Sequence, residues 1–274
     1  MNTERNKNIA IELAREIEKR INENLKVNID DATIISGYSK RQIQNIFKSA
    51  TGLNIGKYIR KRILTKAAIL VKLTKKKIFH IAMDLHFSTQ QHFNKAFIRE
   101  FNCTPLEYRN SLYMDCSKLT PDFSVDIPEY TLVKTEIKSF KLKTWPFRYQ
   151  SGLLGNVTER GNSIRKRKIL NILNNKNKYA FIISRIKPND SNELYVTIDA
   201  ESGFIDKVHY NNKIDKTSCC KIFFHGTWEN YIKLGHFIFT IIDITHPLFT
   251  IEKFELTPKE DNFKINIYIP IIDI

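Results

Sequence analysis

Two segments of the chain, 39–50 and 89–100, combine an apolar stripe with outward side chains that can hydrogen-bond to nucleic-acid bases. In the first segment, Ile43, Ile46 and Phe47 recur at helical spacing and must face inward. The residues left on the outer face are Arg41, Gln42, Gln44, Asn45 and Lys48. Arginine pairs with guanine edges in the major groove, and glutamine or asparagine pairs with adenine edges, each contributing about 1–3 kcal/mol of discrimination. This face therefore has the chemistry to read a base sequence.

The second segment repeats the first at an offset of fifty residues. The offset pairs apolar positions, such as Phe47 with Phe97 and Tyr58 with Tyr108, while the outward positions differ. The outward residues of the second segment are Gln90, Gln91, His92, Asn94 and Lys95. A solvated helix face would explain any single Gln or Asn, whereas two equivalent faces in one basic region favour contact with DNA.

Each polar face belongs to the second helix of a predicted helix-turn-helix unit. The turns are centred on Gly37 and on His86, and an amphipathic helix with apolar residues from Ile9 to Leu25 packs before the first unit. A helix over 55–73 links the two units and spans roughly 28 Å. Successive major grooves on one side of B-DNA are about 34 Å apart. We therefore expect both reading helices to lie on one side of a duplex.

Composition and charge agree with contact to a polyanion. The chain has 274 residues, a net charge of +15 and 42% hydrophobic residues, which is enough for about two folded domains. Residues 1–115 hold 21 Lys or Arg against 11 Asp or Glu, so the positive excess concentrates where the repeat lies. No apolar run is long enough to span a bilayer, and the first residues show no signal-peptide pattern. We expect a cytoplasmic protein, on the nucleoid when bound, with no membrane partner.

The two units resemble the DNA-binding domain of the AraC/XylS family of transcription regulators. The resemblance rests on Gly37–Lys48 and on Ile81, Ala82, Phe87, Ser88, Gln90, Gln91, Phe93, Phe97, Thr104, Pro105, Tyr108 and Arg109. It implies that Arg41, Gln44 and Asn45 occupy base-reading positions, whereas the second reading helix can hold phosphate instead of bases. Rob-type regulators carry tryptophan and arginine where this chain has Arg41 and Asn45, which leaves the operator sequence open. His86 replaces the family's usual turn glycine, and a positive φ there costs about 1 kcal/mol.

Beyond a polar segment at 116–129, which we interpret as a linker, the pattern changes to that of strands. The predicted elements are a strand at 131–142, a helix at 158–173, strands at 179–186 and 194–199, a strand at 218–225, a helix at 228–243, and strands at 249–256 and 263–269. This repeated order predicts an α+β domain of two βαββ repeats. The protein is thus expected to have two domains: an all-α DNA-binding domain at 1–115 with two helix-turn-helix units, and a second domain at 130–274.

The second domain resembles the GyrI-like effector domains, built as SHS2 pairs, that follow the DNA-binding domain in Rob-type regulators. The resemblance implies an aromatic-lined groove with a buried glutamate that binds amphipathic or cationic small molecules. The candidate residues are Trp145, Tyr149, Trp228, Glu255 and Tyr268. Strand alternation places Glu252 and Glu255 on opposite faces, and the family match favours Glu255. Both tryptophans are more often core residues than ligand contacts.

Three further runs have plainer alternatives. The run Lys75–Lys77 could touch phosphate or form a solvated connection. The run Arg165–Lys168 is interpreted as surface charge rather than as a second nucleic-acid contact. Cys219 and Cys220 lie in an apolar run, which favours buried cysteines over a thiol sensor.

Together these features predict a sequence-specific DNA-binding transcription regulator, an activator by family resemblance, that reads two adjacent major grooves as a monomer. Its predicted partners are double-stranded promoter DNA, RNA polymerase, and a small amphipathic or cationic effector or a protein. No cofactor, metal site or catalytic residue is predicted, because the sequence has no nucleophile elbow, metal-ligand spacing or phosphate loop. Two alternatives remain: a second domain that only mediates protein contacts, and a small-molecule-processing enzyme tethered to DNA.

Overall fold

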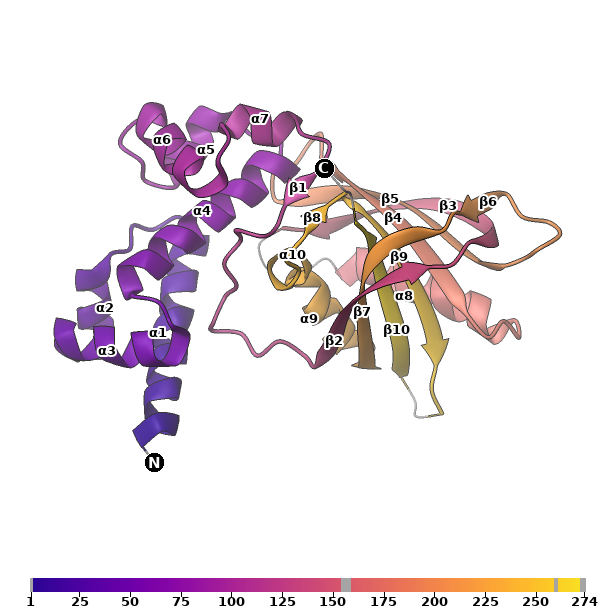
Figure 1. Ribbon diagram of the computed structural model, residues 1–274, viewed down its shortest axis with the longest axis horizontal. Helices are drawn as coiled ribbons and strands as arrows, with labels where there is room; N and C mark the ends of the chain where they lie inside the picture. Colours follow the sequence, from indigo (N-terminus) through magenta and orange to yellow (C-terminus); the bar gives the residue numbers. More distant parts are fainter. Residues whose placement is uncertain (1, 154–158, 259–260, 272–274) are drawn as a thin grey trace. The chain divides into compact units, whose positions relative to one another are not determined.

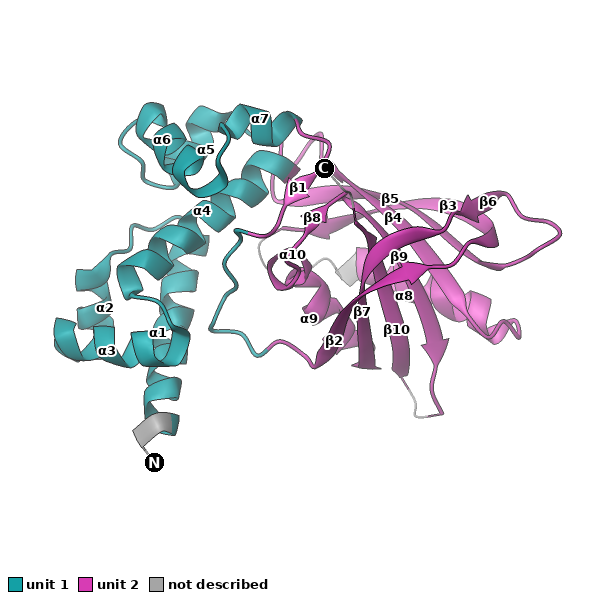
Figure 2. Ribbon diagram, in the orientation of Figure 1, with its two compact units in different colours: residues 1–72, 76–110, 118–126 teal, residues 73–75, 111–117, 127–274 magenta. Residues whose placement is uncertain are grey.

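The computed structural model describes residues 2–153, 159–258 and 261–271. The chain forms two compact units (Figure 1, Figure 2). The helical unit contains Met1–Lys72, Lys76–Asn110 and Lys118–Asp126, and the β-rich unit contains Leu73–Lys75, Ser111–Ser117 and Ile127–Ile274. No described helix combines the length and the apolarity that crossing a membrane requires.

The helical unit has the predicted order of helices. Its elements are α1 (Asn2–Asn22), α2 (Ile29–Ser36), α3 (Lys40–Thr51), α4 (Ile55–Leu73), α5 (Ile78–Asp84), α6 (Gln90–Phe101) and α7 (Pro105–Asn110). α2 and α3 form the first helix-turn-helix unit, α5 and α6 form the second, and α4 connects them (Figure 1). The reading helices α3 and α6 therefore lie where the outward polar faces were predicted.

Caps fix where the two reading helices begin and end. The Ser39 hydroxyl accepts a hydrogen bond from the Gln42 amide at 3.4 Å, and the Thr89 hydroxyl accepts one from the His92 amide at 3.0 Å. These bonds satisfy amides that the first helical turn leaves without a partner. α3 ends at Gly52 with a φ of 74°, a left-handed conformation that suits glycine. Because the caps set where α3 and α6 begin and end, they also set which side chains of these helices point outward.

Each reading helix is held in place by its own apolar cluster. Leu13 of α1 packs with Phe47 of α3 and Tyr58 of α4. In the second half, the Phe97 ring lies 5.6 Å from Phe93 and 4.5 Å from Phe101, measured between ring centroids. Burial of such side chains stabilises a fold by about 1.5–3 kcal/mol each. The scaffold beneath α3 and α6 is thus specified by the apolar half of the fifty-residue repeat.

The segment expected to be a linker, 116–129, is divided between the two units. Residues 118–126 pack on the helical unit, where the Phe123 ring stacks on Tyr58 with centroids 5.3 Å apart. The Thr120 amide donates to the Thr65 hydroxyl at 2.9 Å, and its carbonyl accepts from Arg62. This stretch is irregular in backbone, yet its contacts with α4 hold it in place.

The β-rich unit is built on an antiparallel sheet. Its elements are β1 (Met114–Asp115), β2 (Tyr130–Ile137), β3 (Phe140–Gly152), α8 (Glu159–Asn174), β4 (Ala180–Pro188), β5 (Tyr195–Ile205), β6 (Asn212–Ile214), β7 (Thr217–Thr227), α9 (Trp228–His236), α10 (Ile238–Ile241), β8 (Thr245–His246), β9 (Phe249–Leu256) and β10 (Asn262–Pro270). The eight-stranded sheet has the order β2-β7-β10-β9-β4-β5-β3-β6, and β1 pairs separately with β8.

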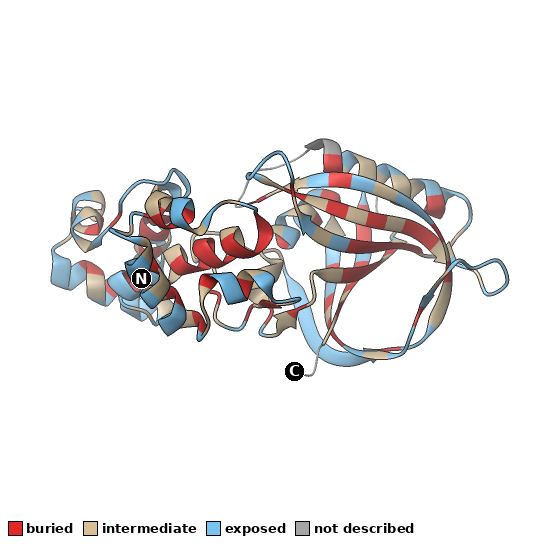
Figure 3. Cartoon of the chain, turned by 90° about the horizontal axis from the view of Figure 1, so that it is seen from above, coloured by how far each residue is buried: buried red, intermediate tan, exposed pale blue. Residues whose placement is uncertain are grey.

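The sheet curves into a half-barrel, along which buried residues run in stripes (Figure 3). One apolar cluster contains Ile137 of β2 and Ile214 of β6, which are the two edge strands. Residues from both edges meet only if the sheet curls around that cluster. Because successive side chains of a strand point to opposite faces, Glu252 lies on the face opposite to Ile251, which belongs to the cluster. Helices α8 and α9 cover the Glu252 face.

Three predicted elements differ from those observed. The strand predicted at 194–199 is longer, because β5 continues to Ile205. The strand predicted at 131–142 is two strands, β2 and β3, and β3 continues to Gly152. These strands pair with different partners, β2 with β7 and β3 with β5. The helix predicted at 228–243 ends as α9 at His236, and α10 follows it. The order strand, helix, strand, strand is present twice, as β3-α8-β4-β5 and as β7-α9-β9-β10, with the short elements α10 and β8 inserted in the second.

Candidate functional site

The outer face of α3 is available to a ligand. Arg41, Gln42, Asn45 and Lys48 are exposed, and Gln44 is half-buried. Within the described part of the chain, no side-chain hydrogen bond or ion pair engages Arg41 or Lys48. The face presents cationic donors and amides that both donate and accept, which is the set of groups that base edges require.

The outer face of α6 is more engaged with its own surroundings. Gln91, His92 and Lys95 are exposed, whereas Gln90 and Asn94 are half-buried. The His92 ring lies 5.7 Å from the Phe87 ring, and its Nδ1 lies 3.3 Å from the Ser88 hydroxyl. The side-chain oxygen of Asn94 is buried. Among the outer residues of α6, His92 therefore already has side-chain contacts, whereas Arg41 and Lys48 of α3 have no hydrogen bond or ion pair in the described part of the chain.

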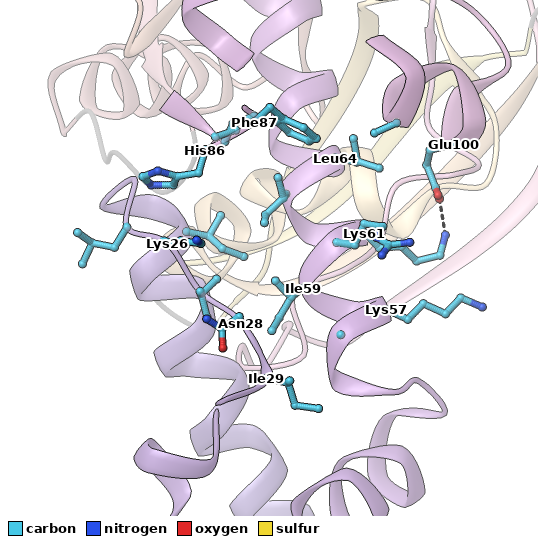
Figure 4. A pocket seen from close by; sticks show the side chains of 18 of the residues that line it. Lys26, Asn28, Ile29, Lys57, Ile59, Lys61, Leu64, His86, Phe87 and Glu100 are labelled. Carbon is cyan, nitrogen blue, oxygen red and sulfur yellow. Dashed lines mark hydrogen bonds and ion pairs between the residues drawn. The ribbon is translucent and has the colours of Figure 1, made fainter. Parts of the chain in front are cut away.

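A cleft of about 890 Å³ lies between the two helix-turn-helix units. Gln44 of α3 and His92 of α6 both line it, so each reading helix borders the same hollow. Figure 4 shows its floor on α4, with Lys57 and Lys61, and shows Lys26 and His86 close together on one side.

Among the charged residues that line this cleft, cations outnumber acidic groups. The cationic residues are Lys26, Lys57, Arg60, Lys61 and Arg99, and the acidic residues are Asp84 and Glu100. Lys61 forms an ion pair with Glu100. Among the described residues, the other four cations have no ion-pair partner and are exposed. The cleft thus concentrates unpaired positive charge between the two reading helices, which suits a polyanion.

A buried ionic network fixes α4, the floor of this cleft. Arg62 donates to both carboxylate oxygens of Glu18, at 2.6 and 2.7 Å, and joins α4 to α1. The Tyr58 hydroxyl donates to Glu18 at 3.0 Å, and burial raises the pKa of Tyr58. This bidentate pair lies in the interior, so its geometry is rigid.

The basic runs noted in the sequence have different surroundings. Lys76 forms an ion pair with Asp84 at 2.8 Å. Arg165, interpreted from the sequence as surface charge, is instead largely buried, with 11% of its side chain exposed. That interpretation was wrong because α8 turns this position toward the sheet, while Arg167 is exposed.

The five residues expected to line one ligand groove do not lie together. Tyr149 and Trp228 are buried on the face of the sheet that α8 and α9 cover. Trp145 is 44% exposed. Glu255 and Tyr268 lie on the opposite face, where Tyr268 packs against the cluster that contains Ile251. The expectation that Glu255 joins the aromatic residues is therefore corrected.

The carboxylate among the aromatic rings is Glu252. Arg165 pairs with Glu252 at 2.8 Å, and Tyr231 donates its hydroxyl to the other carboxylate oxygen at 2.5 Å. The guanidinium lies 5.5 Å from the Tyr149 ring centroid, 5.8 Å from Trp228 and 5.2 Å from Tyr231. These are cation–π distances, so the site holds a cation that the chain itself supplies. Strand alternation already separated Glu252 from Glu255, but nothing in the sequence marked Arg165 or Tyr231.

The cysteines and the titratable clusters of the described residues suggest no further chemistry. Cys219 and Cys220 are buried in β7, and burial raises the pKa of both thiols. A raised pKa keeps a thiol protonated and slow to react. No group of three or more His, Cys, Asp or Glu that could hold a metal ion occurs within residues 2–153, 159–258 and 261–271.

Comparison with known proteins places these features among DNA-binding regulators. The family described as "Helix-turn-helix domain" matches residues 34–111. The protein named "Putative HTH-type transcriptional regulator YkgA" of Escherichia coli (strain K12) is 30% identical over 184 residues, which cover 65% of this chain and 75% of YkgA. The regulatory protein SoxS of Salmonella typhimurium is 45% identical over 86 residues, covering 31% of this chain and 80% of SoxS. The transcriptional regulator Rob of the same species is 36% identical over 113 residues, covering 40% of this chain and 39% of Rob.

Proposed function

Because the chain belongs to the AraC/XylS family of transcription regulators, we propose that it binds promoter DNA by placing α3 and α6 in adjacent major grooves. The observation that carries the proposal is the cleft that both reading helices border, with its unpaired cations between them. Two reading helices in one chain can recognise an asymmetric site. A monomer is therefore sufficient for binding.

We assign the reading of bases chiefly to α3. Arg41, Gln44 and Asn45 would contact base edges, with Gln42 and Lys48 at the margin of the groove. In α6, the exposed Gln91 and Lys95 are the main DNA contacts, and His92, Gln90 and Asn94 support them. Because His92 already contacts Ser88 and Phe87, we assign the contribution of α6 more to phosphate contact than to base reading.

The cleft would receive the backbone of the DNA between the two major grooves. A duplex that spans both reading helices must pass over the hollow that they border. Lys57 and Arg60 on α4, with Lys26 and Arg99 at the sides, would then face phosphate groups. Such contacts raise the affinity for any sequence and make it depend on salt.

For the β-rich unit we propose a sensory role built on two SHS2-like repeats. An organic cation would compete with Arg165 for Glu252 and for the rings of Tyr149 and Trp228. Occupation by the ligand would release α8 from the sheet and so change the protein's contact with RNA polymerase, the partner expected of an activator. The rival role is a permanent Arg165–Glu252 pair in a unit that only contacts proteins.

Binding to genomic fragments tests the DNA-reading proposal. The wild-type chain should select particular fragments, and Arg41→Ala should lose about 1–3 kcal/mol of preference at one base position while keeping salt-sensitive binding to mixed DNA. Lys138→Ala, which removes an exposed cation of the β-rich unit, is the matched control and should keep its selectivity. Unchanged selectivity of the Arg41 variant would refute its assignment.

A thermal-shift comparison tests the sensory role. Lipophilic cations should stabilise Arg165→Met more than the wild-type chain, because the variant vacates the cation position beside Glu252. If cations stabilise neither protein, the protein-contact role is favoured instead.

A further inference from the structure

A hydrogen bond between His86 and Asn24, called the tie below, joins the turn of the second helix-turn-helix unit to the loop that follows α1. His86 Nε2 lies 2.6 Å from the carbonyl oxygen of Asn24, a residue 62 positions earlier in the chain. A carbonyl oxygen can only accept, so Nε2 carries the hydrogen and donates it.

The backbone at His86 favours glycine. His86 has a φ of 60°, and the surrounding turn is closed by its own amide, which donates to Met83, and by the Phe87 amide, which donates to Ala82, both at 3.0 Å. A residue with a Cβ atom is disfavoured in this left-handed conformation. The imidazole thus occupies a position where the turn alone would prefer no side chain.

Asn24, the other end of the tie, is anchored in the first half of the unit. It lies just beyond α1, where its amide donates to Ile21 at 3.2 Å. Its side-chain oxygen accepts from Lys66 of α4 at 2.9 Å, and the same ammonium donates to the Ile21 carbonyl. These contacts fix the position of the Asn24 carbonyl independently of its hydrogen bond with His86.

The tie links the positions of the two reading helices. On one side, α1 packs on α3 through the cluster that contains Leu13 and Phe47. On the other side, His86 is in the turn that leads into α6. Both ends line the cleft, and His86 lies on the same side of it as Lys26 and Asn28 of the α1–α2 loop (Figure 4). α4 joins the units as one helix, and the tie adds a second connection away from its axis.

We infer that His86 is a positioning residue that sets the separation of α3 and α6, and thereby the operator spacing that the protein accepts. The inference rests on the proposed reading of two major grooves. One added base pair moves a half-site by about 3.4 Å and turns it by about 35°. A tied pair of units resists this displacement, whereas units joined by α4 alone can follow it.

His86→Gly separates the tie from the fold of the turn. Glycine suits the φ of 60°, so the turn is kept while the hydrogen bond to Asn24 is lost. His86→Asn provides a second variant, because asparagine tolerates the left-handed backbone and its side chain is shorter than that of histidine. Asn102→Gly is the matched control: Asn102 has a φ of 62° and ends α6, and its cap bond runs to Ile98 within that helix.

The measurement is the affinity of the full chain for a selected operator and for versions with one base pair inserted or deleted between the half-sites. The wild-type chain and Asn102→Gly should prefer one spacing. In both His86 variants this preference should fall by about two- to twelvefold, which is the net effect of one hydrogen bond.

Different results of this spacing measurement would overturn the role of His86 or the two-groove proposal. Wild-type preference retained in His86→Gly and His86→Asn would overturn the role of His86, as would a wild-type chain that binds its operator at every spacing. A chain that selects no fragment at all would overturn the two-groove proposal, and the inference with it.

Discussion

Removal of the unpaired cations of the cleft should weaken the salt dependence of DNA binding without changing the preferred sequence. Each lysine or arginine that neutralises a phosphate contributes about 0.9 to the slope of log affinity against log salt concentration. The double variant Lys57→Ala/Arg60→Ala removes two exposed cations from α4. Its slope should therefore be shallower by about 1.8.

The size of this effect makes it easy to measure. Between 50 and 200 mM salt, a difference of about 1.8 in slope corresponds to roughly a tenfold smaller loss of affinity for the double variant than for the wild-type chain. Fluorescence anisotropy with a labelled operator, titrated at four or five salt concentrations in this range, gives both slopes. Both proteins should select the same fragments, because phosphate contacts carry no base information.

An ion pair in the same cleft supplies the control. Lys61→Met/Glu100→Gln removes one charge of each sign, and the two side chains neutralise each other in the wild-type protein. This variant should keep the wild-type slope. Equal slopes for Lys57→Ala/Arg60→Ala and the wild type would show that the cleft does not face DNA, and would refute the proposed docking.

Three further predictions concern the scaffold. Arg62→Met leaves the Glu18 carboxylate buried without its cation and should lower the free energy of unfolding by about 3–5 kcal/mol in urea titrations; a loss below about 1 kcal/mol would contradict the buried pair. Thr89→Ala removes the cap of α6 and should cost about 1 kcal/mol by the same measurement, with Ser139→Ala, which removes an exposed hydroxyl between β2 and β3, as the control. Burial lowers the pKa of Lys66 from its ordinary 10.5 to about 8, so between these values the folded chain binds fewer protons than the unfolded chain. The free energy of unfolding should therefore rise with pH across this window, and the same rise in Lys66→Met would contradict this origin.

The sequence predicted the helical unit well because its information is local. Apolar spacing set the inward faces of α3 and α6, and residues such as Ser39 and Gly52 mark the helix ends directly. The positive φ at His86, expected from the family's turn glycine, is confirmed. The hydrogen bond to Asn24 was not foreseeable, since it joins residues 62 positions apart and leaves no periodic trace.

The β-rich unit was less predictable for the same reason. Strand alternation separated Glu252 from Glu255 but did not show which face α8 and α9 would cover. Arg165 lies in a run of four basic residues, where the sequence does not distinguish one largely buried cation from its neighbours. The break between β2 and β3 was missed because Lys138 and Ser139 interrupt a strand pattern without a glycine or proline.

The packing of residues 118–126 on α4 has a practical consequence for isolating the DNA-binding half. A fragment that ends at residue 110, where α7 ends, would strip Phe123 from the Tyr58 ring and deprive Arg62 of the Thr120 carbonyl. Such a truncation exposes the Tyr58 ring to solvent, and an exposed aromatic surface favours aggregation. It also removes a hydrogen-bond partner of the buried Arg62 and so weakens the contacts that hold α4. The helical unit thus includes residues up to Asp126, well past the last helix of the second helix-turn-helix unit, and we expect a fragment that ends at residue 126 to be more stable than one that ends at residue 110.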